Sequence, residues 1–315
     1  MPSYSATAGS AEGFGTVLLS SHAADLHAAF APSLGMIGCS LRHRGAELLA
    51  QRRGLAQYAA AGSTMGIPLL HPWANRLSGF EYTAAGTRVA LSSSAPRLHR
   101  DAHGHPMHGL LAAYPGWEVI ACAADADGTR LVARLDFGAD ADLLAAFPFP
   151  HRLELAVSLR AATLTLSSTL SPSGDVAVPI SFGFHPYLQL PGVERAAWRI
   201  EAPVRRRARL DEFGIPTGAT EPFSIQAGPL GARTFDDLFP GLDCPARFAL
   251  AGGGRRITVV FEEGYPCAQI FAPPGEALIC FEPMTAPTNA LISGAGLRLV
   301  PPGSAFTARF SITVE

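Results

Sequence analysis

The sequence contains no lysine, so all 24 of its basic residues are arginine. A Schiff-base aldolase, a pyridoxal phosphate enzyme and a P-loop phosphate site each need a lysine amine. The chain therefore belongs to none of these classes. Charged residues are also scarce: they make up 16% of the sequence, and the net charge is -2. Proteins that bind nucleic acid usually carry a dense basic face. We expect no nucleic-acid partner.

Cysteine pairs and long apolar runs are missing as well. The five cysteines are scattered and form no C-x-x-C, which predicts free thiols. No run of about 18 apolar residues occurs, and the first residues lack the basic and apolar regions of a secretion signal. We therefore expect a cytoplasmic protein that makes no contact with a membrane.

Glycine and proline, by contrast, are abundant and spread along the whole chain, with 32 and 26 copies, which favours short strands joined by turns. Apolar residues alternate in segments 151–160, 163–170 and 255–263, as in strands with one buried face. No linker or repeat divides the sequence. We predict one all-β domain over residues 1–315, a sandwich of two sheets. The alanine-rich segments 56–61 and 140–146 are either short helices or loops.

Two motifs about a hundred residues apart contain a candidate acid and a candidate base. SFGFHPYLQLPG places His185 among aromatic residues, and CFEPMTAPTNA places Glu282 after an apolar run. An imidazole and a carboxylate are the minimum for moving protons on a neutral, polyhydroxylated substrate. A buried carboxylate is costly without a partner or a function. The alternatives are a core histidine and a structural ion pair.

Other motifs offer groups for binding. GIPLLHPWANR ends in Asn75 and Arg76, and a guanidinium suits sugar hydroxyls, although it also suits the exposed end of a strand. HGHPMHG has three histidines, at positions 103, 105 and 108, that would suit a metal if the segment were a strand. Its glycines and proline indicate instead a loop that presents one functional histidine.

Three further segments are weaker signals. FDDLF (235–239) contains paired acids, and YPCAQIF (265–271) contains Gln269 in a strand-like run. The basic run at 205–209 is flanked by acidic residues, so it is either a solvated strand edge or a site for an anion.

Taken together, seven motifs occur in an order that resembles the aldose 1-epimerase (galactose mutarotase) family, and the resemblance extends from about Phe14 to Ile312. The motifs are GIPLLHPWANR, HPMHGLLAAYPGW, SFGFHPYLQLPG, GIPTG, FDDLF, YPCAQIF and CFEPMTAPTNA. The resemblance implies a large antiparallel β-sandwich of the galactose mutarotase type, with few short helices and with the sugar in an open cleft. Two departures concern the shape of the pocket, since Leu188 replaces a common phenylalanine and His71 a frequent apolar aromatic residue.

The resemblance also implies roles for individual residues. Glu282 would be the catalytic base and His185 the catalytic acid. The sugar hydroxyls would be held by Arg76, Asn75, His108, Asp236 and Gln269. Whether Asp236 or its neighbour Asp237 faces the sugar is open.

The predicted activity is therefore interconversion of the α and β anomers of a free hexose through the open-chain aldehyde, by a monomer or homodimer that needs no cofactor and no metal. One rival is a hexose-6-phosphate 1-epimerase, whose cleft would need arginines such as Arg152 or the run at 205–207. A second is a sugar-binding protein without catalysis. A third is a metal-dependent enzyme that uses His103, His105 and His108.

Overall fold

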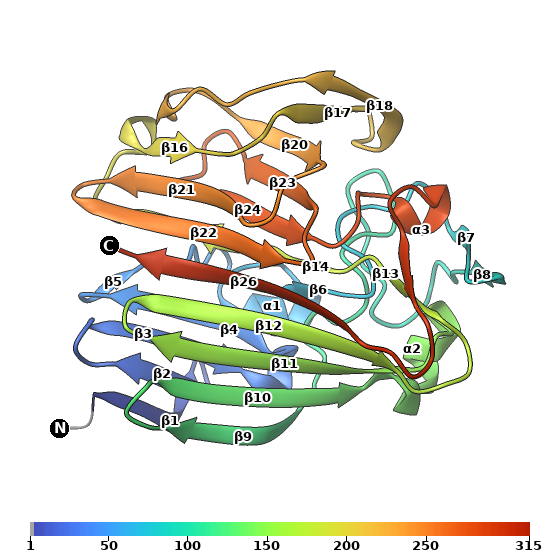
Figure 1. Ribbon diagram of the computed structural model, residues 1–315, viewed down its shortest axis with the longest axis horizontal. Helices are drawn as coiled ribbons and strands as arrows, with labels where there is room; N and C mark the ends of the chain where they lie inside the picture. Colours follow the sequence, from blue (N-terminus) through green and yellow to red (C-terminus); the bar gives the residue numbers. More distant parts are fainter. Residues whose placement is uncertain (1–2) are drawn as a thin grey trace.

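The segments with alternating apolar residues form strands of a nine-stranded sheet. The computed structural model describes residues 3–315, and in it β11 (His151–Arg160), β12 (Thr163–Pro172) and β22 (Arg255–Glu263) belong to this sheet (Figure 1). Buried and more exposed residues alternate along β11 and β12, as predicted. The order across the sheet is β19 (Gly228–Pro229), β16 (Arg199–Glu201), β21 (Ala246–Gly252), β22, β26 (Phe306–Val314), β12, β11, β10 (Thr129–Asp136) and β9 (Glu118–Ala124).

A second layer lies behind this sheet in Figure 1. Its six-stranded sheet contains β20 (Phe235–Pro240), β23 (Cys267–Ala272), β24 (Ile279–Met284), β14 (Gly183–Phe184), β6 (Leu69–Leu70) and β15 (Tyr187–Leu188). A five-stranded sheet contains β1 (Tyr4–Ala11), β2 (Phe14–Ser21), β3 (Leu26–Ala31), β4 (Ile37–His43) and β5 (Ala46–Glu47). Three two-stranded ribbons are β7 (Glu81–Ala84) with β8 (Thr87–Ala90), β13 (Val178–Ile180) with β25 (Arg298–Val300), and β17 (Arg206–Leu210) with β18 (Pro216–Pro222).

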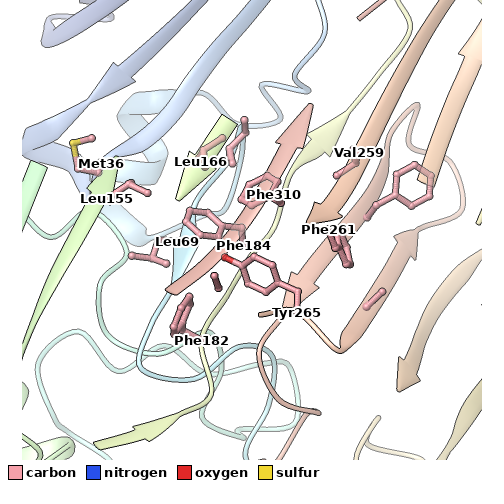
Figure 2. Close-up of a cluster of buried hydrophobic side chains, with 14 of the residues drawn as sticks. Met36, Leu69, Leu155, Leu166, Phe182, Phe184, Val259, Phe261, Tyr265 and Phe310 are labelled. Carbon is pink, nitrogen blue, oxygen red and sulfur yellow. The ribbon is translucent and has the colours of Figure 1, made fainter. Parts of the chain in front are cut away.

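Aromatic side chains fill the space between the layers (Figure 2). Phe310 of β26 and Phe184 of β14 have ring centroids 5.0 Å apart, and each is almost completely buried. Burying a side chain of this size contributes roughly 1.5–3 kcal/mol. On β24, Phe281 packs against Phe248 of the nine-stranded sheet. Since side chains alternate along a strand, the next residue, Glu282, points to the opposite face of the six-stranded sheet.

Helices are few and short. The α-helices are α1 (Leu55–Ala61), α2 (Ala141–Ala146) and α3 (Ala290–Ser293), and the 3-10 helices are η1 (Pro32–Leu34), η2 (Phe137–Ala139) and η3 (Arg195–Ala197). Both alanine-rich segments are thus helical, and Asp140 caps α2 through the backbone N–H groups of Asp142 and Leu143. All ladders between named strands are antiparallel, so the predicted all-β sandwich is confirmed. None of the helices in residues 3–315 has the length and apolar character needed to cross a membrane.

Candidate active site

A cavity of about 420 Å³ opens where the six-stranded sheet meets the loops around residues 52–64 and 99–112. This volume lies within the usual range for small-molecule sites. Six of the residues expected to form the site line it, and these are Asn75, Arg76, His108, His185, Asp236 and Glu282. Residues far apart in the sequence therefore meet around one space.

Strand register places the acidic groups. Glu282 on β24 is paired with Gln269 on β23, so both side chains share one face of the sheet. The Gln269 amide donates a hydrogen bond of 2.6 Å to Oδ1 of Asp236 on β20. Asp236 lines the cavity. Gln269 is buried next to Asp236, and it is not one of the described residues that line the cavity. Asp237 lies on the other face, where it accepts a hydrogen bond from Arg207 at 3.3 Å.

His185 lies between β14 and β15, next to Glu282. Its Nε2 atom is 3.3 Å from Oε1 of Glu282, and both side chains are at least 94% buried. The imidazole stacks on the ring of Tyr187, with centroids 4.2 Å apart and planes 4° from parallel, as the aromatic neighbours in the motif suggested. The Tyr187 hydroxyl lies 2.6 Å from the Thr64 hydroxyl. These contacts hold the imidazole in one orientation.

Burial shifts the pKa values of both groups in opposite directions. It raises the pKa of Glu282 well above its ordinary value, and the negative charge of Asp236 adds to this. It lowers the pKa of His185 well below its ordinary value, and the neighbouring His108 and Arg52 add to this. The charged form of each group alone is therefore costly. Both shifts favour the neutral forms, so the pair holds one proton in the free site, and Glu282 carries it.

His108 reaches the cavity from a tight turn. Its φ is +62°, and its backbone N–H donates to the Asn75 carbonyl at 2.9 Å. The next residue, Gly109, has φ +71°, and a β-carbon there would lie 2.2 Å from the His71 carbonyl oxygen, so only glycine fits. The His108 and His185 rings are nearly perpendicular, with centroids 5.5 Å apart. Burial and the charges of Arg76 and His99 lower the pKa of His108 to about 3, so it is neutral near neutral pH.

Arg76 is held from several sides. Its Nε donates to Oδ2 of Asp101 at 2.9 Å, and its Nη1 donates to Oδ1 of Asn75 at 3.1 Å. Its Nη2 lies 3.9 Å from Asp236. Asp101 also accepts hydrogen bonds from the backbone N–H groups of His103 and His105. The two motifs that end at Arg76 and at Gly109 thus form one polar wall of the cavity.

His103 and His105, the other two histidines of the HGHPMHG motif, are not among the described residues that line the cavity. The rings of His103 and His105 pack against Phe213, at 5.3 and 5.4 Å. In residues 3–315, no three His, Cys, Asp or Glu side chains are grouped so as to hold a metal ion.

The arginines that sequence reasoning proposed for an anion site lie elsewhere. Arg152 is exposed and pairs with Asp136 at 3.4 Å. Arg205 pairs with Asp243, and Arg207 pairs with Glu221 and Asp237. The basic run is therefore a solvated edge in which acidic partners offset the charge.

The two departures from the family pattern both point into the core. Leu188 is fully buried in the main apolar cluster. His71 is buried too, and its Nε2 lies 2.9 Å from Nε2 of His151 among phenylalanine rings. Neither residue is among the described residues that line the cavity, so any effect on the shape of the pocket is indirect.

Other lining residues had no signal in the local sequence. They include Arg52, Arg53, Thr64, His99 and Arg100, and tertiary packing brings them to the site. Segment 52–64 follows a turn and carries no motif, so no spacing rule could have linked it to His185.

Several buried polar atoms of the site have no hydrogen-bond partner in residues 3–315. They are Nδ1 of His185, Nδ1 of His108, Oε2 of Glu282 and Oε1 of Gln269. Buried polar atoms are usually hydrogen-bonded, and these four lie at or beside the cavity, where a ligand could bind them. The arrangement offers donors, acceptors and an acid–base pair to a small molecule that is rich in hydroxyl groups.

Comparison with known proteins agrees with this chemistry. A family model described as aldose 1-epimerase matches residues 38–313. The chain belongs to the aldose 1-epimerase family. Glu282, His185 and the residues around them all lie within the matched region.

Relatives of this aldose 1-epimerase family member extend over most of its length. It is 23% identical to the protein YihR of Escherichia coli over 282 residues, which cover 82% of this chain and 86% of YihR. The crystal structure of the Slr1438 protein from Synechocystis matches with a TM-score of 0.78 at 26% identity, covering 95% of each chain. A galactose mutarotase-like protein from Clostridium acetobutylicum matches with a TM-score of 0.85 at 16% identity, covering 99% of each chain, and shows the same fold.

Proposed function

We propose that this protein is an aldose 1-epimerase that interconverts the α and β anomers of an aldohexose through the open-chain aldehyde. The observation that carries the proposal is the contact between His185 and Glu282, 3.3 Å apart beside a cavity lined with hydrogen-bonding groups. Membership of the family supports an isomerase acting on a sugar.

In the first half of the reaction, Glu282 removes the proton from the anomeric hydroxyl, and His185 donates a proton to the ring oxygen. The bond between C1 and the ring oxygen breaks, and the aldehyde forms. After rotation about the C1–C2 bond, the former ring oxygen, now the hydroxyl oxygen on C5, attacks the other face of the carbonyl. His185 takes its proton back, and Glu282 returns a proton to the anomeric oxygen.

The pair needs one proton in total at every stage of this cycle. The pKa shifts favour a free site with this proton on Glu282, so the proton must pass to His185 across the 3.3 Å contact before ring opening, and ring opening returns a proton to Glu282. The opposed pKa shifts of the two buried groups favour this one-proton state over the states with two protons or none. Because the cycle returns each proton, it requires no net exchange with solvent.

Arg76, Asn75, His108 and Asp236 are proposed to orient the sugar, and Gln269 to hold Asp236 in place. A cavity wall with these donors and acceptors fixes the hydroxyls relative to the acid–base pair, which lowers the entropy cost of reaching the transition state.

A polarimetric assay tests the proposal. Freshly dissolved α-D-glucose and α-D-galactose would be followed with wild-type protein and with the Glu282→Gln variant. We expect wild type to accelerate mutarotation and the variant to lose roughly 10²- to 10⁴-fold of that activity, the usual contribution of a general base. A variant with wild-type turnover would remove Glu282 from the mechanism, and a sugar that binds wild type without acceleration would indicate a sugar-binding protein.

A further inference from the structure

The tip of the β17–β18 hairpin lies against the side of the cavity that holds Arg76. The two strands form a separate ribbon beside β20, and residues 211–215 are the turn that joins them (Figure 1). Oδ1 of Asp211 accepts hydrogen bonds of 2.9 Å from the backbone N–H groups of Phe213 and Ile215, and Ile215 is buried. These contacts hold the turn in one conformation.

Gly214, in this turn, touches the guanidinium of Arg76. Its φ is +77°, and a β-carbon there would lie 3.2 Å from Nη1 of Arg76, which is closer than most β-carbon contacts. Glycine tolerates this backbone conformation and has no side chain to displace the guanidinium. The backbone of the turn can therefore pack directly against Arg76.

Phe213 fastens the turn to the loop on which Arg76 also depends. Its ring packs edge-on against the rings of His103 and His105, with centroids 5.3 and 5.4 Å apart. The backbone N–H groups of the same two histidines donate to Oδ1 of Asp101, and Oδ2 of Asp101 accepts from Nε of Arg76. One series of contacts thus runs from Phe213 through this loop to Arg76.

Phe213 is also the only aromatic residue among the exposed large hydrophobic residues of the described chain, at 39% exposure. An exposed ring buries little apolar surface and contributes little to the core. Its removal should therefore leave the fold intact, and this makes the contact with the two histidines open to a test.

Two of the three nitrogens of the Arg76 guanidinium already have partners. Nε donates to Asp101 at 2.9 Å, and Nη1 donates to Asn75 at 3.1 Å. Nη2 makes no hydrogen bond within residues 3–315, and it lies 3.9 Å from Asp236, which lines the cavity together with Arg76. Nη2 therefore has N–H groups available for a sugar hydroxyl, as long as the guanidinium keeps this orientation.

We propose that Phe213 and Gly214 are positioning residues for Arg76. The contacts of Phe213 with His103 and His105 fix the turn, and the fixed turn keeps the guanidinium from rotating away from the sugar. The inference rests on the proposed epimerase function, in which Arg76 orients the sugar. An arginine that is already ordered loses less conformational entropy when it binds a ligand, so the turn should strengthen sugar binding.

The Phe213→Ala variant tests this role in the polarimetric assay with α-D-glucose and α-D-galactose. We expect kcat/KM to fall about tenfold, mainly through a higher KM, because Arg76 binds the sugar and takes no part in proton transfer. Phe213→Tyr, which keeps the ring, should stay within about threefold of wild type. Gly214→Ala should resemble Phe213→Ala, since its β-carbon would displace Nη1 of Arg76.

Val119→Ala is the matched control. Val119 is 38% exposed, almost the same as Phe213, and it lies on β9 at the edge of the nine-stranded sheet. This variant should leave kcat and KM unchanged. Circular dichroism would establish that each variant is folded.

A double-mutant cycle shows whether Phe213 acts through Arg76. In an Arg76→Ala background, the addition of Phe213→Ala should change kcat/KM by less than about twofold, because the side chain that Phe213 positions is gone. A general effect on the structure would instead persist in this background.

The outcomes separate the two proposals. Wild-type kinetics in Phe213→Ala, a loss confined to kcat, or an equal loss in the Arg76→Ala background would overturn the positioning role and leave the epimerase intact. No acceleration of any sugar by the wild-type protein would overturn both.

Discussion

Nε2 of His185, between β14 and β15, lies 3.3 Å from Oε1 of Glu282 on β24, although about a hundred residues separate the two in the chain. The contact joins a proton donor to a proton acceptor in a site that excludes most water. The activity of this pair should depend on pH, on Tyr187, which stacks on the His185 ring, and on Asp236, which lies on the same side of the sheet as Glu282.

The pH dependence of kcat/KM should be unusually broad. An ordinary histidine acid loses its proton, and its activity, as the pH rises through about 6.5. Here the active state is the pair with one proton, the pKa of His185 is lowered and that of Glu282 is raised. Activity should fall on the acid side only below 6.5, where a second proton binds, and on the alkaline side where the pair loses its last proton. Rates measured from acid to alkaline pH would show this plateau; a decline centred at 6.5 with rising pH would contradict it.

Tyr187 should act as a positioning residue for His185. Its ring is parallel to the imidazole at 4.2 Å, and stacking of this kind is worth roughly 0.5–1.5 kcal/mol. Tyr187→Leu should lower kcat about tenfold and shift the acid limb of the pH profile, while Tyr187→Phe, which keeps the ring, should stay within about threefold of wild type. Equal losses in both variants would mean that the hydroxyl, which lies 2.6 Å from the Thr64 hydroxyl and 3.3 Å from Nε2 of His185, is the important part.

The adjacent acids Asp236 and Asp237 should have separable roles. Asp236 lines the cavity and receives the Gln269 amide, so Asp236→Asn should lower kcat/KM about tenfold with little change in stability. Asp237 pairs with the partly exposed Arg207, so Asp237→Asn should cost at most about 1 kcal/mol of stability and leave activity near wild type. Steady-state kinetics and urea denaturation of both variants would test this, and the reverse pattern would show that the register assigns the wrong acid to the cavity.

The buried pair His71 and His151 should make the fold sensitive to acid. Burial lowers the pKa of His151 to about 4 and that of His71 well below its ordinary value, so both are neutral when folded. Between about pH 6.5 and 4 the unfolded chain binds protons that the folded chain does not, and stability falls as the pH falls, by up to about 1.4 kcal/mol per pH unit for each histidine.

A His71→Leu/His151→Leu variant should therefore show a shallower loss of stability over this range. Urea denaturation at a series of pH values would measure the free energy of unfolding. The exposed His22 provides the control, since His22→Leu should leave the slope unchanged. An unaltered slope in the double variant would show that other groups dominate acid unfolding.

The sequence alone determined the strands and the chemistry of the site. Alternating apolar residues in β11, β12 and β22 share one buried face because side chains in a strand point to opposite sides in turn. This local rule needs no knowledge of the rest of the chain. The histidine and glutamate motifs also identified an acid and a base, since few other residue types can move protons near neutral pH.

Only the tertiary structure decided which neighbours complete the site. Asp236 and Asp237 are adjacent, and the pairing of Asp236 with Phe271 on β23 sends one side chain to the cavity and the other to Arg207. Shifting that pairing by one residue would exchange them, and nothing in FDDLF sets it. Likewise Gly62 and His99, which are far apart in the sequence, pack against each other at the cavity. Contacts between residues distant in the chain depend on how all the layers pack, and local patterns carry no information about that.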